Sequence, residues 1–157
     1  MEKKNKSAKV YVAGSLRHTP MSWWKIYEKI GKVVEEAGME AHVPHLNTAS
    51  TVGFTDKEIF NGLADHVVDK VFDADREQVE KSDIIVAEVS NPSLGSGIEI
   101  GWALDNNKKI ICLTNNAMNV TPLIRGAAKK GLIKLIDYDN EKEGLNKLRE
   151  MLKVMRI

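Results

Sequence analysis

The stretch SNPSLGSGIEIG, residues 90–101, joins an apolar run at residues 84–87 to a helical pattern that continues through Trp102. Small residues between a strand and a helix leave the first N–H groups of the helix free to bind an anion such as a phosphate. Glu99 lies in the first turn of that helix. We therefore expect an anion-binding loop and an acidic side chain in the same place.

Strands and helices alternate along the rest of the chain. Apolar runs predict strands at 10–13, 40–43, 83–89, 109–114 and 132–136, and helical periodicity predicts helices at 22–37, 96–106, 122–130 and 141–154. Residues 56–82 read as two helical pieces that break near Asp73, and residues 46–54 as a loop. Near-continuous apolar strands joined by helices favour a parallel sheet covered on both faces. We predict an α/β fold, a flavodoxin-like doubly wound sheet of five parallel strands in the order 2-1-3-4-5.

Length and composition exclude several classes of protein. The 157 residues fit one domain, with residues 1–8 expected to be flexible, and the net charge of +1 gives no reason to expect polymeric nucleic acid as a partner. No apolar run approaches the roughly 20 residues that span a bilayer, and residues 1–9 lack a signal-peptide core, so we expect a cytoplasmic protein. Cys112 is the only cysteine and the four histidines lack ligand spacing, so no disulfide, metal or cofactor is expected.

The predicted topology places the ligand. In such sheets, ligands bind outside the carboxyl ends of the strands, where the strand order reverses between the first and third strands. The loops that follow those two strands, residues 14–18 and 91–97, both carry glycine and serine. Two independent signals therefore indicate the same site.

Phosphate is a suitable guest for these loops. Ser93 and Ser96 offer hydroxyl groups, while Gly95 and Gly97 permit a close backbone approach. The pattern is neither a Walker loop nor a dinucleotide fingerprint. A purely structural turn in which Ser96 caps the helix would read the same way.

Acidic residues supply the candidate catalytic groups. Glu99 could be a nucleophile or only a first-turn acid that complements the helix dipole. Glycosidic chemistry needs a second acid, because one carboxyl attacks and the other handles the proton. Asp73, Asp75 and Asp83 compete for that role, and Asp75 is the best candidate.

Three further residues lie at the same predicted edge of the sheet. Arg17 follows the first loop and is either a surface residue or a bidentate phosphate ligand. His45 follows Pro44 at the end of the second strand. Tyr11, within the first strand, needs a partner for its hydroxyl if it is buried, and that partner could be Glu99.

Taken together, these segments resemble the nucleoside 2-deoxyribosyltransferase superfamily, and within it the 2′-deoxynucleoside 5′-monophosphate N-glycosidases. The resemblance covers about residues 10–138. It is carried by YVAGSLR (11–17), by SDIIVAEV (82–89) running on through PSLGSGIEIG (92–101), and by LIRGAA (123–128). The ordered set of segments is far more specific than any one of them.

The resemblance implies roles for individual residues. Glu99 would be the nucleophile, Asp75 the general acid and Tyr11 the residue that orients Glu99. The phosphate would be bound by residues of both loops: Gly14, Ser15, Arg17, Ser93, Gly95 and Ser96. The family acts as a homodimer, so residues 119–125 of a partner chain would complete the site, with Thr121 where those N-glycosidases tend to have Ser and Leu123 where they tend to have Met. His45 matches only if one residue is inserted after Gly38.

The leading function is hydrolysis of the N-glycosidic bond of nucleoside 5′-monophosphates, through a covalent glycosyl–glutamate intermediate. A deoxyribosyltransferase that exchanges bases is the first alternative. That branch usually places a polar C-terminal residue on the sugar, and this chain ends KVMRI, residues 153–157. The second alternative is a nucleotide-binding sensor without catalysis.

Overall fold

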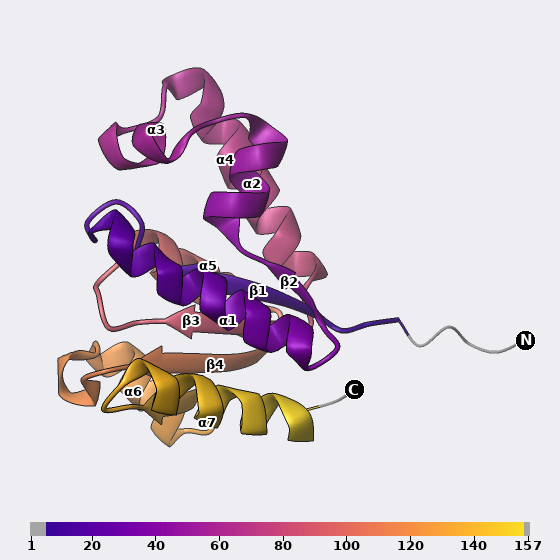
Figure 1. The fold of residues 1–157 in the computed structure, drawn as a ribbon, viewed down its shortest axis with the longest axis vertical. Coiled ribbons are helices and arrows are strands. Elements are labelled where there is room, and N and C mark those ends of the chain that lie inside the picture. Colours follow the sequence, from indigo (N-terminus) through magenta and orange to yellow (C-terminus); the bar gives the residue numbers. More distant parts are fainter. Residues whose placement is uncertain (1–5, 156–157) are drawn as a thin grey trace, which may run out of the picture.

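A five-stranded parallel sheet forms the centre of the molecule (Figure 1). The computed structural model of the chain describes residues 6–155, so residues 1–5 of the segment expected to be flexible lie outside the described part. The strands, from one edge to the other, are β2 (Glu40–His42), β1 (Lys9–Gly14), β3 (Ile84–Glu88), β4 (Lys109–Thr114) and β5 (Lys134–Asp137). This confirms the predicted order 2-1-3-4-5 and the flavodoxin-like α/β fold.

Helices cover both faces of the sheet, because successive residues of each strand point to opposite sides. On one face, Val10, Val12 and Val86 pack beneath α1 (Lys25–Glu36) and α7 (Glu141–Val154). On the other face, Tyr11, Ala13 and Ile85 pack against a second set of helices. That set is α4 (Asp65–Lys81), α5 (Leu94–Asp105) and α6 (Pro122–Lys129).

The prediction that residues 46–54 form a loop is wrong. Helix α2 (Pro44–Val52) occupies it. Pro44 stands at the first helical position, where its missing N–H costs nothing, and Gly53 ends the helix with a left-handed φ of 89°.

The prediction that the helix breaks near Asp73 is also wrong. The chain forms α3 (Asp56–Asn61) and then α4, which continues through Asp73 without interruption. The break falls instead at Gly62, where φ is 111°. A capping box between Thr55 and Glu58 begins α3.

Helices α2, α3 and the first half of α4 stand beyond the β2 edge of the sheet (Figure 1). Two short 3-10 helices complete the described chain, η1 (Met21–Trp24) before α1 and η2 (Ala117–Asn119) before α6. No helix within residues 6–155 combines the length and the apolar character needed to cross a bilayer.

Candidate active site

The site lies at the carboxyl ends of β1 and β3, the two strands at which the strand order reverses. These strands pair in parallel, with Gly14 beside Glu88. The loops that follow them therefore begin side by side, as the sequence predicted. Glu99 comes to this place from α5, and Asp75 from α4.

Tyr11 and Glu99 form the central contact of the site. The Tyr11 hydroxyl donates a hydrogen bond of 2.7 Å to Oε1 of Glu99 across 88 residues of sequence. Tyr11 is fully buried, and burial together with the nearby Glu99 and Asp75 carboxylates raises the pKa of its hydroxyl well above the usual value. The hydroxyl therefore keeps its proton and acts as a permanent donor to Glu99.

Glu99 and Asp75 are both biased toward holding a proton. Burial raises the pKa of Glu99 to about 8; the Tyr11 hydrogen bond opposes this shift and the Asp75 charge adds to it. Burial also raises the pKa of Asp75, against the hydrogen bond that Thr48 donates to it and the effect of the nearby Tyr11 hydroxyl. Two neighbouring carboxyls in one desolvated place favour sharing a single proton. A pair that holds one proton can supply a nucleophile and an acid together.

The uninterrupted course of α4 explains how Asp75 reaches the carboxyl edge of the sheet. Asp75 lies seven residues before Ser82, which ends the helix at the opposite edge. At 1.5 Å per residue, this stretch of helix rises about 10 Å, about two-thirds of the roughly 16 Å of a five-residue strand. Asp75 therefore reaches the carboxyl half of the sheet without any bend in α4, and there its side chain lines the same pocket as Gly14 and Glu99.

A small pocket contains both carboxyls. Its walls come from β1, α1, α2, α4 and α5, and the residues that line it are Val12, Gly14, Leu16, Tyr27, Pro44, His45, Asp75 and Glu99. His45, which the resemblance aligns only with an insertion, thus lines the same pocket as the two carboxyls.

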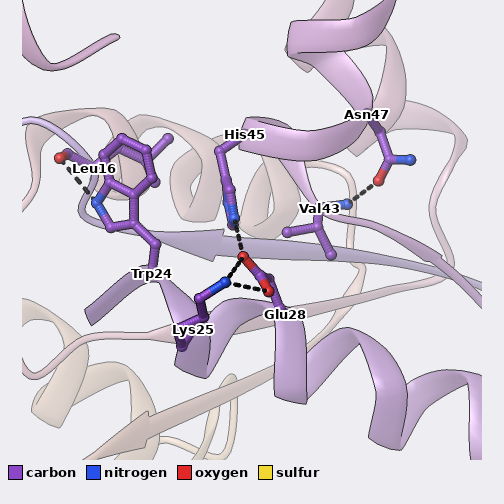
Figure 2. Close-up of polar contacts among 7 residues, drawn as sticks. All are labelled: Leu16, Trp24, Lys25, Glu28, Val43, His45 and Asn47. Carbon is purple, nitrogen blue, oxygen red and sulfur yellow. Dashed lines mark hydrogen bonds and ion pairs between the residues drawn. The ribbon is translucent and has the colours of Figure 1, made fainter. Parts of the chain in front are cut away.

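Figure 2 shows how His45 is held. Its buried ring places Nε2 3.3 Å from Oε1 of Glu28, which also pairs with Lys25. The Trp24 indole lies beside the His45 ring and donates a hydrogen bond of 3.2 Å to the Leu16 carbonyl. The wall of the pocket formed by α1 and α2 is thus fixed by side-chain contacts.

The loop before α5 differs in one detail from the structural alternative considered above. Ser93, rather than Ser96, caps the helix, and its Oγ accepts a hydrogen bond of 3.2 Å from the Ser96 N–H. The Oγ of Ser96 is buried and makes no hydrogen bond within the described residues. A Cβ added at Gly97 would meet nothing within 4 Å, so the backbone there is open on that side. A free hydroxyl beside an open helix terminus suits an anionic ligand.

Glu88, at the end of β3, anchors the loop before α5. The sequence did not reveal this role. Glu88 is buried and accepts hydrogen bonds from the hydroxyls of Ser90 and Tyr138. The Ser90 Oγ in turn accepts a bond of 2.9 Å from the Asn115 N–H. The loop is therefore tied to the ends of both β4 and β5.

The loop after β1 is shaped by packing. A Cβ on Gly14 would lie 2.2 Å from Cε1 of Tyr27, so only glycine fits beneath that ring. The carbonyl of the buried Ser15 accepts hydrogen bonds from Tyr27 and Thr19. Arg17 is exposed, and its guanidinium extends toward Gly62 at the turn between α3 and α4. Arg17 therefore lies at the rim of the site.

Thr121 and Leu123 are not part of this pocket. They lie at the start of α6, where the Thr121 Oγ1 caps the helix by accepting from the Leu123 N–H. Leu123 is 83% exposed. Within one chain, these two residues are separate from Glu99 and Asp75.

Thr48 and His42 are two further neighbours of the site. The Thr48 Oγ1 donates a hydrogen bond of 2.6 Å to Oδ1 of Asp75 and lies 2.9 Å from Nε2 of His42. Residues 46–54 were expected to be a loop, so Thr48 carried no prediction. The signal that could have revealed the helix is the spacing between Pro44 and Gly53.

Among residues 6–155, no group of three or more His, Cys, Asp or Glu side chains could hold a metal ion.

Comparison with known proteins shows the family to which the chain belongs. The sequence profile of nucleoside 2-deoxyribosyltransferases matches residues 10–148. A 5-hydroxymethyl-dUMP N-hydrolase of Esox lucius is 32% identical over 143 residues, which cover 87% of this chain and 91% of that protein. A putative 2′-deoxynucleoside 5′-phosphate N-hydrolase of Thermofilum pendens is 31% identical over 146 residues, which cover 92% and 94%.

A solved structure agrees with these relatives. A CMP N-glycosidase of Clostridium botulinum is 28% identical, has a TM-score of 0.63, and is matched over 89% of this chain and 97% of that one. The profile match includes both loops and both carboxyls of the site. The chain is therefore a member of the nucleoside 2-deoxyribosyltransferase family.

Proposed function

We propose that this protein is an N-glycosidase that hydrolyses nucleoside 5′-monophosphates to the free base and the sugar 5-phosphate. The observation that carries the proposal is the pair of carboxyls, Glu99 and Asp75, in one pocket with the Tyr11 hydroxyl on Glu99. The N-hydrolase and N-glycosidase names of the family members above support the reaction class.

The proposed chemistry proceeds in two steps through a covalent intermediate. Glu99, as the carboxylate, forms an ester bond to the anomeric carbon while the bond from that carbon to the base nitrogen breaks. Asp75 gives its proton to the departing base. Asp75 then takes a proton from water, whose oxygen attacks the anomeric carbon and releases Glu99 as a carboxylate. Because the anomeric carbon is displaced twice, the configuration at the sugar is retained.

The two glycine- and serine-containing loops would hold the phosphate. The amino terminus of α5, with Ser93, Gly95 and the unpaired hydroxyl of Ser96, offers hydrogen-bond donors and a positive dipole end. Ser15 lies in the neighbouring loop, and Arg17 at the rim provides a guanidinium that could close over the phosphate.

We also propose that the whole chain forms one domain that acts as a homodimer in the cytoplasm, where nucleoside monophosphates occur. Apolar side chains form two adjacent stripes with i, i+4 spacing, Val68 and Phe72 on α4, and Leu94, Ile98 and Trp102 on α5. We call these five residues the α4–α5 face. Leu94 is 91% exposed, which supports a partner on this face.

A second copy on the α4–α5 face would bring its residues 119–125 to the site of the first chain. This proposal explains why Thr121 and Leu123 lie apart from the pocket of their own chain. We expect Ile98→Asp to convert a dimer into a monomer in analytical ultracentrifugation. The matched control is Val154→Asp, which alters an exposed apolar residue on the opposite side of the sheet and should remain dimeric. A monomeric parent at micromolar concentration would overturn the shared site.

Release of free base from a panel of nucleoside 5′-monophosphates tests the function. We expect the parent to release base without any acceptor, and the corresponding nucleosides without phosphate to react at least about tenfold more slowly, the loss for one missing charged contact. Glu99→Gln should lose nearly all activity because the amide is not a nucleophile.

The same assay separates the two alternatives. Product formed only when an acceptor base is added would identify a transferase. Binding of nucleotides without any release of base would identify a sensor. The covalent step is tested by mass spectrometry of Asp75→Ala incubated with the 4-nitrophenyl glycoside of 2-deoxyribose 5-phosphate, whose leaving group needs no proton. The first step can then proceed while hydrolysis lacks its base, so sugar 5-phosphate should accumulate on the peptide that contains Glu99.

A further inference from the structure

A chain of hydrogen bonds reaches Asp75 from the β2 edge of the sheet. Thr48, on α2, is 2% exposed and donates to Oδ1 of Asp75 at 2.6 Å. Nε2 of His42, the last residue of β2, lies 2.9 Å from the same Thr48 oxygen. Asp75 is thus connected to β2 through two side chains that come from separate elements.

The direction of these bonds follows from counting protons. The Thr48 hydroxyl has one proton and gives it to Asp75, so it can only accept from His42. His42 must therefore carry its proton on Nε2. Its ring stacks on Tyr11, with ring centroids 5.4 Å apart and an angle of 12° between the planes, which fixes the orientation of the imidazole.

His42 keeps this donor role across neutral pH. Burial lowers the pKa of its ring to about 4, against the smaller opposing effect of Glu40. The ring is neutral above that pH, so its single N–H stays committed to Thr48.

We propose that Thr48 and His42 are positioning residues for the proton-donating carboxyl, committing Oδ1 of Asp75 to Thr48 and leaving Oδ2 for the departing base. This inference rests on the proposed function. When Asp75 Oδ2 transfers its proton to the base nitrogen, the carboxylate that forms already has a donor at Oδ1. Hydrogen bonds to a charged acceptor are stronger than those to a neutral one, so Thr48 stabilises the transfer as the charge develops. No proton leaves Thr48 or His42 in this step.

The test compares two leaving groups. A natural nucleoside monophosphate needs protonation of its base, whereas the 4-nitrophenyl glycoside of 2-deoxyribose 5-phosphate releases a stable anion without a proton. We expect Thr48→Val to lower kcat about 10- to 100-fold on the nucleotide, the loss for one hydrogen bond to a charged group. On the activated substrate the loss should be less than about threefold, and KM should change little on either substrate.

Three variants complete the set. Thr48→Ser keeps the hydroxyl and should recover most of the nucleotide activity. His42→Phe keeps a ring that can stack on Tyr11 but removes the donor, so it should show a smaller loss with the same dependence on leaving group. Thr51→Val is the matched control on the same helix, because the Thr51 hydroxyl donates only to the Asn47 carbonyl at the surface, and it should match the parent.

Equal losses on both substrates for Thr48→Val, or no loss on either, would overturn the positioning role. The positioning role would also be overturned if the Thr48→Ser variant were as slow as Thr48→Val on the nucleotide, because the hydroxyl would then be irrelevant. Asp75→Asn provides the separate check on the proposed function. The readout is the release of the leaving group in the first turnover, which precedes the step in which Asp75 acts as a base. If Asp75→Asn slows that release equally on both substrates, the acid assignment of Asp75 fails, whatever Thr48 does.

Discussion

At the level of single residues, the site concentrates groups whose charged forms are disfavoured by burial. Tyr11 donates a hydrogen bond to Glu99, and Thr48 donates one to Asp75. Burial raises the pKa of Tyr11, Glu99 and Asp75. A nucleophile kept in such a place is prepared for reaction but costs the folded protein stability when it ionises. The cost has a definite dependence on pH.

We predict that Glu99→Gln is more stable than the parent at high pH. The carboxyl has a pKa of about 8 when folded and about 4.5 when unfolded, so the folded chain binds more protons between these values. The free energy of unfolding of the parent therefore falls as pH rises from about 4.5 to about 8. The amide of the variant cannot ionise, and its oxygen can still accept the hydrogen bond from Tyr11, so this loss disappears.

Thermal unfolding of both proteins at pH 4.5 and pH 8.5 measures the effect. We expect the variant to melt at least about 2 to 4 °C above the parent at pH 8.5, the shift that roughly 1 kcal/mol produces in a domain of this size. The difference should vanish near pH 4.5. An advantage of the same size at both values would contradict the assignment, because it could not arise from ionisation.

At the level of elements, the turn from β1 to α1 requires glycine at position 14, because the Tyr27 ring packs against it. The Tyr27 ring occupies the space where any side chain at position 14 would lie, and its hydroxyl holds the Ser15 carbonyl at 2.7 Å. The same turn leads to Arg17 at the rim. Packing against α1 therefore fixes a loop that we assign to phosphate binding.

We predict that Gly14→Ala destabilises the protein by about 1–3 kcal/mol, the usual cost of overpacking a core. The Tyr27 ring must move, so the KM for the nucleotide should rise as well. Gly101→Ala serves as the control, because a Cβ there meets nothing within 4 Å inside α5, and alanine favours the helix. Chemical denaturation that gives both variants the same stability would refute this account of the turn.

At the level of the whole molecule, the proposed dimer depends on where the exposed apolar residues lie. The α4–α5 face lies on the same side of the sheet as α6, which carries Thr121 and Leu123 at its start. A symmetric dimer through one face uses the same patch twice, so each site would receive residues from both chains.

We predict that two inactive variants complement each other when mixed. Glu99→Gln removes the nucleophile, and Thr121→Arg places a bulky side chain where the partner segment would meet the phosphate. Random exchange of subunits gives half heterodimers, each with one site free of both changes, so activity should reach about a quarter of that of the parent. Mixtures that stay inactive after subunit exchange, verified by mass spectrometry, would show that each chain builds its own site.

Most of the fold and several residues of the candidate site could be predicted from the sequence. The parallel order followed from five apolar runs separated by helices, and Tyr11, Glu99, Asp75 and His45 were all identified before their contacts were known. The prediction failed at α2, because the apolar pattern between Pro44 and Gly53 is weak and the helix is stabilised mainly by packing against α4. Thr48 was missed for the same reason.

The order of the strands and the two loops that meet between β1 and β3 could be predicted from local sequence patterns alone. This is because burial on both faces of a parallel sheet requires apolar strands, and small residues are required where strand meets helix. The sequence left Asp73 and Asp83 in competition with Asp75, and it is the folded chain that brings Asp75 into one pocket with Glu99. That placement depends on the uninterrupted course of α4 and on the hydrogen bond from Thr48, contacts between residues far apart in the chain that no local pattern records.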